Sequence, residues 1–236
     1  EFYQLDLEMS FVEQEDVFNV VEKLLVNTFK KFSNKKLMYD QFLKISYADT
    51  MIKYGSDKLD LRNPLVINDI TEVFLREDVS FEIFKKLTKS GSKVRCISTK
   101  NTKDKPRSFF DNIDKWAKEQ GASGLAYFTF EDDGELSAKG PIGKFFSKEA
   151  LLEIMKKTNS EVGDSIFMAC GKLNELEKIT ALARDKIAQD LDLIDDDIFA
   201  FCWIVDYPMF ERDETTNKIG FSHNPFSMPQ GDLTDK

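Results

Sequence analysis

A row of polar side chains near the start of the chain is the first feature whose residue types and spacing could do chemistry. Gln4, Asp6 and Glu8 alternate with apolar residues between Phe2 and Phe11. In an extended strand this spacing places the three side chains on one face, about 7 Å apart from one to the next. An amide and two carboxylates in such a row can hold an ammonium group or a metal ion. The alternative is a half-exposed strand whose polar face only meets water, and the pattern alone favours that alternative.

The single histidine, His223, is a second candidate because an imidazole titrates near neutral pH. It lies between Ser222 and Asn224 and is followed by Pro225 and Phe226. Such a group can act as an acid, a base or a donor that orients a ligand, whereas a lone loop histidine more often has no special role. The three cysteines lie far apart, without C-x-x-C spacing or a histidine nearby, which argues against a zinc site.

A dense polar loop, YGSDKLDLRNP, occupies residues 54–64. It concentrates the charges of Asp57, Lys58, Asp60 and Arg62 within a few positions. The simplest interpretation is a surface loop with local ion pairs, each contributing about 0.2 to 1 kcal/mol.

The composition indicates an ordinary folded protein. Of its 236 residues 42% are hydrophobic and 32% charged, with only 11 Gly and 6 Pro, which excludes collagen and low-complexity sequence. The net charge of -9 gives no bulk attraction to nucleic acid or to an anionic membrane, so any contact with RNA must be local. Sparse cysteines and the lack of an apolar stretch of ~20 residues indicate a cytoplasmic protein that makes no membrane contact. The chain starts at Glu1 directly in a strand pattern, so we expect a piece of a longer protein.

Hydrophobic periodicity predicts the elements that position these candidates. Residues 2–11 have the alternation of a half-buried antiparallel strand, and residues 17–32 the three- and four-residue spacing of an amphipathic helix. A short helix over residues 47–54 is predicted between Ser46, an N-terminal cap, and Gly55, which favours a left-handed C-terminal cap.

The middle of the chain alternates strands and helices, with the lengths of an α/β module. The pattern predicts strands at 93–98, 124–130 and 164–170, and helices at 107–120, 147–157 and 172–190. Residues 198–205 are almost wholly apolar, which predicts a strand buried on both faces. We therefore expect an α+β protein in which an α/β insert interrupts an antiparallel host. The expected segments are 1–72, 73–198 for the insert, and 199–236.

Four separated blocks resemble bacterial-type aspartyl-tRNA synthetases, in that family's order and at suitable separations. They are EFYQLDLEMSF at 1–11, YGSDKLDLRNP at 54–64, WIVDYPMFE at 203–211 and FSHNPFSMP at 221–229. The middle resembles the family's inserted GAD domain, which also occurs in tRNA-dependent amidotransferase subunits, through GASGLAYF, GPIGKFF and GDSIFMACG. The resemblance implies part of a class II catalytic domain, an antiparallel sheet interrupted by the GAD insert.

The resemblance also implies roles for the polar row and for the loop histidine. Asp6 would pair with the ammonium group of aspartate, and Gln4 would hydrogen-bond the polar groups around its reacting carboxyl. His223 would lie against the substrate side chain. Glu8 and Asn224 would have supporting roles, Asn224 in place of the second histidine of the family's H-H-P-F.

The reaction that the resemblance implies is activation of L-aspartate by ATP and Mg²⁺ to aspartyl-adenylate, followed by transfer to tRNA-Asp. Whether the parent also charges tRNA-Asn is left open, and so is the effect of Leu59, which replaces a proline of the family. The parent would be a homodimer. This piece lacks the family's motifs 1, 2 and 3, so we expect it to be inactive alone, monomeric and without a tightly bound cofactor. The competing interpretation is a noncatalytic module whose GAD-type insert contacts tRNA or an amidotransferase partner.

Overall fold

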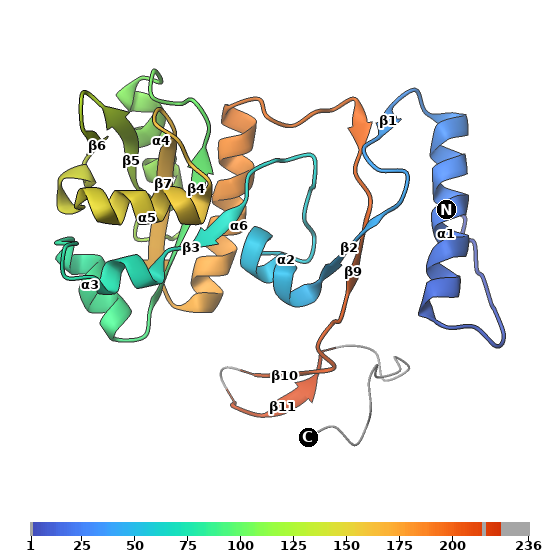
Figure 1. The fold of residues 1–236 in the computed structure, drawn as a ribbon. Helices are drawn as coiled ribbons and strands as arrows, with labels where there is room; N and C mark the ends of the chain where they lie inside the picture. Colours follow the sequence, from blue (N-terminus) through green and yellow to red (C-terminus); the bar gives the residue numbers. More distant parts are fainter. Residues whose placement is uncertain (1, 214–215, 223–236) are drawn as a thin grey trace.

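The largest part of the protein is a five-stranded sheet with helices on both faces. The computed structural model describes residues 2–213 and 216–222 (Figure 1). The sheet has the order β3-β4-β7-β5-β6. Its strands are β3 (Ile67–Asp69), β4 (Lys93–Thr99), β5 (Ala126–Asp132), β6 (Leu136–Lys139) and β7 (Ser165–Gly171).

Every pairing in this sheet is antiparallel. The α+β class is therefore confirmed, whereas the α/β description of the middle segment, typical of parallel strands, is wrong. Alternation of strands and helices determines the type of each element, but the direction of a strand depends on where the connecting helix returns the chain. Here β7 lies between β4 and β5, antiparallel to both.

Strand alternation divides the core of this unit into two layers. One face packs against the 3-10 helix η1 (Thr71–Leu75) and the helices α3 (Glu82–Lys89) and α5 (Lys148–Thr158). The other face packs against α4 (Arg107–Glu119) and α6 (Leu173–Asp190). The first layer contains, among others, Val94, Phe128 and Ile166, and the second Ile97, Tyr127 and Phe167. Leu65 and Ile67 are buried in the second layer, so the sheet begins before residue 73.

The short helix and its caps follow from local chemistry, as predicted. Helix α2 spans Tyr47–Tyr54, and the Ser46 hydroxyl accepts a hydrogen bond from the backbone N–H of Asp49 at 3.1 Å. Gly55 ends the helix with φ of 68°, a left-handed conformation that costs glycine little. A Cβ atom there would lie 2.6 Å from the carbonyl oxygen of Glu177, so this position requires glycine for close packing against α6 as well.

Short strand pairs and one long helix form the flanks of the sheet unit (Figure 1). The elements are α1 (Gln14–Phe32), β1 (Lys36–Leu37), β2 (Leu43–Ser46), β8 (Ile198–Phe199), β9 (Cys202–Val205), β10 (Phe210–Arg212) and β11 (Ile219–Phe221). Strands β1 and β8 pair in parallel, as do β2 and β9, whereas β10 and β11 form an antiparallel pair. The host segments are therefore not wholly antiparallel in the described part of the chain.

The predicted strand at 198–205 is interrupted between β8 and β9, and its residues are only half-buried. Helix α1 covers it through aromatic contacts, with the ring of Phe29 at 4.6 Å from Phe199 and 4.8 Å from Phe201. The Phe18 ring stacks on Trp203 at 4.3 Å. The prediction of burial on both faces was wrong because an apolar run shows that a strand can be covered, not that a second layer is present.

The predicted strand over residues 2–11 does not form. Residues 2–9 have no regular secondary structure, and the side chains of Tyr3 and Phe11 are fully exposed. A strand is stabilised by ladder hydrogen bonds to a neighbour, and no strand of the described chain pairs with this segment. No helix in the described residues has the length and apolar character needed to span a bilayer.

Candidate functional site

The polar row predicted from the sequence is exposed, along the irregular segment that precedes α1. The Gln4 amide donates a hydrogen bond from Nε2 to Oδ1 of Asp6 at 2.7 Å, so these two side chains lie on the same side. Glu8 follows in the same exposed segment. His223 and Asn224 lie outside the described residues. The structure therefore brings Gln4 and Asp6 together, and it does not test whether the loop histidine joins them.

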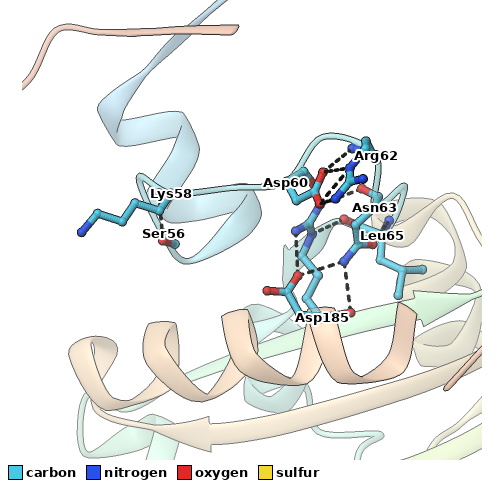
Figure 2. Close-up of polar contacts among 8 residues, drawn as sticks. Ser56, Lys58, Asp60, Arg62, Asn63, Leu65 and Asp185 are labelled. Carbon is cyan, nitrogen blue, oxygen red and sulfur yellow. Dashed lines mark hydrogen bonds and ion pairs between the residues drawn. The ribbon is translucent and has the colours of Figure 1, made fainter. Parts of the chain in front are cut away.

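The loop at residues 54–64 is anchored to α6 rather than solvated throughout (Figure 2). Asp60 accepts hydrogen bonds from Nε of Arg62 at 3.0 Å and from Nη2 at 2.7 Å, a forked pair. The same guanidinium reaches Oδ1 of Asp196 at 3.1 Å through Nη1. Hydrogen bonds from the Arg62 side chain hold the pKa of Asp60 below its ordinary value, against the opposing contribution of burial. The prediction of local ion pairs in this loop is confirmed.

Arg184 of α6 forms the centre of this anchor and is only 2% exposed. Its Nε donates to the carbonyl oxygen of Leu65 at 2.6 Å, and its Nη2 donates to those of Asp60 at 2.9 Å and Asn63 at 2.7 Å. The guanidinium carbon lies 5.0 Å from the centroid of the Tyr54 ring, a cation–π contact. Burial lowers the pKa of Arg184, yet a guanidinium stays protonated at neutral pH.

Asn63 completes the anchor by using both ends of its amide. Its Nδ2 donates to the carbonyl oxygen of Arg184 at 3.2 Å and to Oδ1 of Asp185 at 3.0 Å. Its Oδ1 accepts from the backbone N–H of Leu65 at 3.0 Å. The second half of the loop therefore has a structural function: it fixes the chain where it leaves α2 and enters the sheet.

The first half of the loop has a different character. The Lys58 side chain extends away from the anchor, while its backbone N–H donates to the Ser56 hydroxyl at 3.0 Å (Figure 2). Beside it, the Tyr207 hydroxyl lies 3.5 Å from Oδ2 of Asp57, and its ring packs on Tyr47 at 5.0 Å. Burial, with a further contribution from Asp57, raises the pKa of Tyr207. Asp57 and the two tyrosines therefore form one polar cluster beside the start of the loop.

Sequence reasoning missed Arg184, although a signal was present. The buried side of α6 consists of positions 176, 180, 183, 184, 187 and 188. An arginine within such an apolar stripe indicates that buried hydrogen-bond acceptors pair with its guanidinium. The part of the chain that the structure describes contains no group of three or more His, Cys, Asp or Glu side chains that could hold a metal ion.

Comparison with known proteins gives a consistent result along the whole chain. The family model described as tRNA synthetases class II (D, K and N) matches residues 1–236. A protein of Pelagibacter ubique (strain HTCC1062), named aspartate–tRNA(Asp/Asn) ligase, is 77% identical over 235 residues, covering 100% of this chain and 40% of that protein.

Two further relatives have the same name. One, of Methylorubrum populi, is 49% identical over 233 residues, covering 98% of this chain and 39% of its own length. The other, of a Wolbachia strain from Drosophila simulans, is 52% identical over 236 residues, covering 100% of this chain and 38% of its own length. The chain thus spans about 40% of the length of the curated relatives it matches.

Proposed function

Because this chain belongs to the class II (D, K and N) tRNA synthetases, we propose that it is part of an aspartate–tRNA ligase. The parent protein would join L-aspartate to ATP, forming aspartyl-adenylate and pyrophosphate, and would transfer the aspartyl group to tRNA. The observation that carries the proposal is the 77% identity to a ligase of this name over the full length of the chain.

We propose that the polar row binds the amino acid. Asp6 pairs with the substrate ammonium, and Gln4 donates to the oxygens around the reacting carboxyl. The hydrogen bond between Gln4 and Asp6 supports this assignment, since it shows that both side chains can face one ligand. In the proposal His223 contacts the substrate carboxylate, and Glu8 and Asn224 support the pocket.

The chain would be organised as two catalytic segments, 1–72 and 199–236, around a GAD insert at 73–198. The five-stranded unit supports such an insert, and its strand β3 lies before residue 73, within the proposed first segment. The anchored loop would hold this unit against the first catalytic segment, through the bonds from Arg184 to Asp60 and Asn63.

The substrates follow from the proposed reaction. ATP would arrive as its Mg²⁺ complex, and both tRNA-Asp and tRNA-Asn would be charged, because the relatives' names include both. We further propose that the parent is a cytoplasmic homodimer and that this chain alone is monomeric and binds no cofactor tightly. Light scattering of the isolated chain at micromolar concentration tests the last point, since a stable dimer would contradict it.

Substitution of Asp6 in the full-length parent tests the proposed function. Asp6→Asn keeps the size of the side chain and removes its charge, which leaves the substrate ammonium without its partner. We expect a cost of about 2 to 5 kcal/mol. Pyrophosphate exchange should then slow by roughly one and a half to three and a half orders of magnitude.

Tyr3→Phe provides the control, because Tyr3 alternates with the polar row and its ring is fully exposed. That variant should exchange pyrophosphate at the normal rate. If Asp6→Asn exchanged pyrophosphate at a near-normal rate, the polar row would only contact water and would not bind the substrate.

A further inference from the structure

Two neighbouring clefts open on the insert, on either side of the loop that connects β4 to α4. Each has a volume of about 550 Å³. The first includes Lys100, Lys105 and Lys157 in its lining, and the second includes Lys103, Lys105, Arg107 and Lys139. Lys105 lines both clefts, so the two clefts adjoin at this residue, and we name the six cations of their linings the basic track.

The basic track opposes the charge of the chain as a whole. The chain has a net charge of -9, yet its residues 100–107, KNTKDKPR, contain four cations and one carboxylate. All six cations are exposed. The net negative charge of the chain repels anions in general, so an anionic ligand would bind only where positive charge is concentrated. The basic track is such a place.

Ion pairing separates the track into a neutralised part and a free part. Lys100 pairs with Asp164 at 2.8 Å, Lys139 with Glu131 at 3.1 Å, and Arg107 with Asp111 at 3.2 Å. Lys157 lies 3.4 Å from Glu72. Lys103 and Lys105, at the junction of the two clefts, form no ion pair with any residue in ranges 2–213 and 216–222; Lys105 lies over the Phe109 ring at 5.7 Å.

The aromatic side chains of the second cleft are too buried to stack on a ligand. Phe110 and Tyr127 are 5% and 7% exposed and stack on each other at 4.9 Å. The Tyr127 hydroxyl donates to Oδ1 of Asp111 at 2.6 Å. Neither ring face is free to stack on a nucleobase, which argues against recognition of unpaired bases.

We propose that the basic track binds the phosphate backbone of an RNA helix, with Lys103 and Lys105 as its principal contacts. The extent of the track over two clefts favours a polymer over a single phosphate, and buried rings favour backbone contacts over base contacts. The choice of RNA among polyanions rests on the proposed function, since a tRNA ligase must hold RNA. The track would contribute affinity without reading the sequence.

Fluorescence anisotropy of the 236-residue chain with a labelled 12-base-pair RNA duplex tests the proposal, without ATP or aspartate. Lys103→Gln combined with Lys105→Gln should weaken binding at least about tenfold and reduce the slope of log K against log salt by about 2 units. The matched control is Lys86→Gln with Lys89→Gln, which removes two exposed charges of α3 that line neither cleft and should leave binding unchanged.

Equal losses in both variants, or no RNA binding by the unmodified chain, would overturn the proposal. Preferential binding of polyglutamate would overturn it in favour of an acidic protein partner, and full competition by ATP would overturn it in favour of a mononucleotide site. If the double variant does not fold, RNA should still protect Lys103 and Lys105 of the unmodified chain from acetylation more than Lys86 and Lys89. Because no aminoacylation is measured, failure here leaves the Asp6→Asn test of the parent unaffected.

Discussion

The five-stranded sheet and its flanks contain similar apolar patterns, but they bury them to very different extents. Val94, Phe128 and Ile166 of the sheet are completely buried, whereas α1 has no buried residue and Phe32 at its end is 77% exposed. The sheet has helices on both faces, whereas α1 lies along one side of the parallel strand pairs β1–β8 and β2–β9 (Figure 1). An amphipathic pattern therefore indicates which face of an element can be buried. Whether that face is buried depends on a second layer of structure that covers it.

Hydrogen exchange should show this contrast most strongly. Strand β7 is bonded on both edges, by β4 and by β5, so its amides can exchange only when the sheet opens. Residues 2–9 have no strand partner. We expect amides of β7 to exchange at least about a thousandfold more slowly than those of residues 2–9, as the stability of a folded domain implies. Mass spectrometry of peptic fragments measures both, and comparable protection would contradict the difference in burial.

A matched pair of phenylalanine substitutions should show how this difference in burial affects the free energy of unfolding. Phe128→Ala removes a completely buried ring and should lower the free energy of unfolding by about 3 to 5 kcal/mol. Phe32→Ala removes an exposed ring and should change it by less than about 0.5 kcal/mol. Urea titration followed by circular dichroism tests both variants. Similar losses would mean that the flanks are packed as tightly as the sheet.

The Arg184 anchor joins the two regions and should be the next most sensitive feature. Arg184→Ala leaves the carbonyl oxygens of Asp60, Asn63 and Leu65 without this donor, and we expect a loss of about 3 kcal/mol. Arg184→Lys should restore little, because an ammonium lacks the planar fork. Lys178→Ala, an exposed change on the same helix, is the control in urea titration. A wild-type midpoint for Arg184→Ala would show that the loop is held by other contacts.

The smallest expected effect is a pH dependence of the loop. The pKa of Asp60 is lowered in the folded protein, chiefly by hydrogen bonds from Arg62. The resulting stabilisation is present above the unfolded carboxyl pKa of about 3.9 and is lost as the pH falls through the lower folded value. Asp60→Asn and Arg62→Gln should each flatten the fall in stability below pH 4, measured by urea titration at pH 6 and pH 3. An unchanged slope in both variants would exclude this pair as a cause.

Local chemistry was enough to predict several elements, but it could not predict which strands pair. Ser46 and Gly55 determine α2 through hydrogen bonds and backbone conformation within one segment, so its limits follow from the sequence. The order β3-β4-β7-β5-β6 depends on contacts between distant segments, which alternation cannot reveal. The prediction of a strand over residues 2–11 was wrong for the same reason. Its alternation suits a strand, but no strand of the described chain pairs with it.

The candidate site shows the same division. Gln4 and Asp6 are joined by one hydrogen bond, although the strand that their spacing predicted does not form. Arg184 could not be predicted as the anchor of a loop about 120 residues earlier, because its partners are backbone carbonyl oxygens, which have no signature in the sequence. The unpaired state of Lys103 and Lys105 likewise depends on which carboxylates the fold places beside their neighbours.

The parallel pairing of β2 with β9 has a mechanical consequence. Leu43–Ser46 lies beside Cys202–Val205 in the same direction, so a pull on the chain from its two ends draws the strands past each other along their length. The ladder is then loaded in shear, with its hydrogen bonds sharing the force, rather than opened one bond at a time. Because this ladder joins the chain before and after the five-stranded sheet, that sheet lies outside the path of tension. Stretching the flanks should therefore leave the five-stranded sheet folded until β2 and β9 separate.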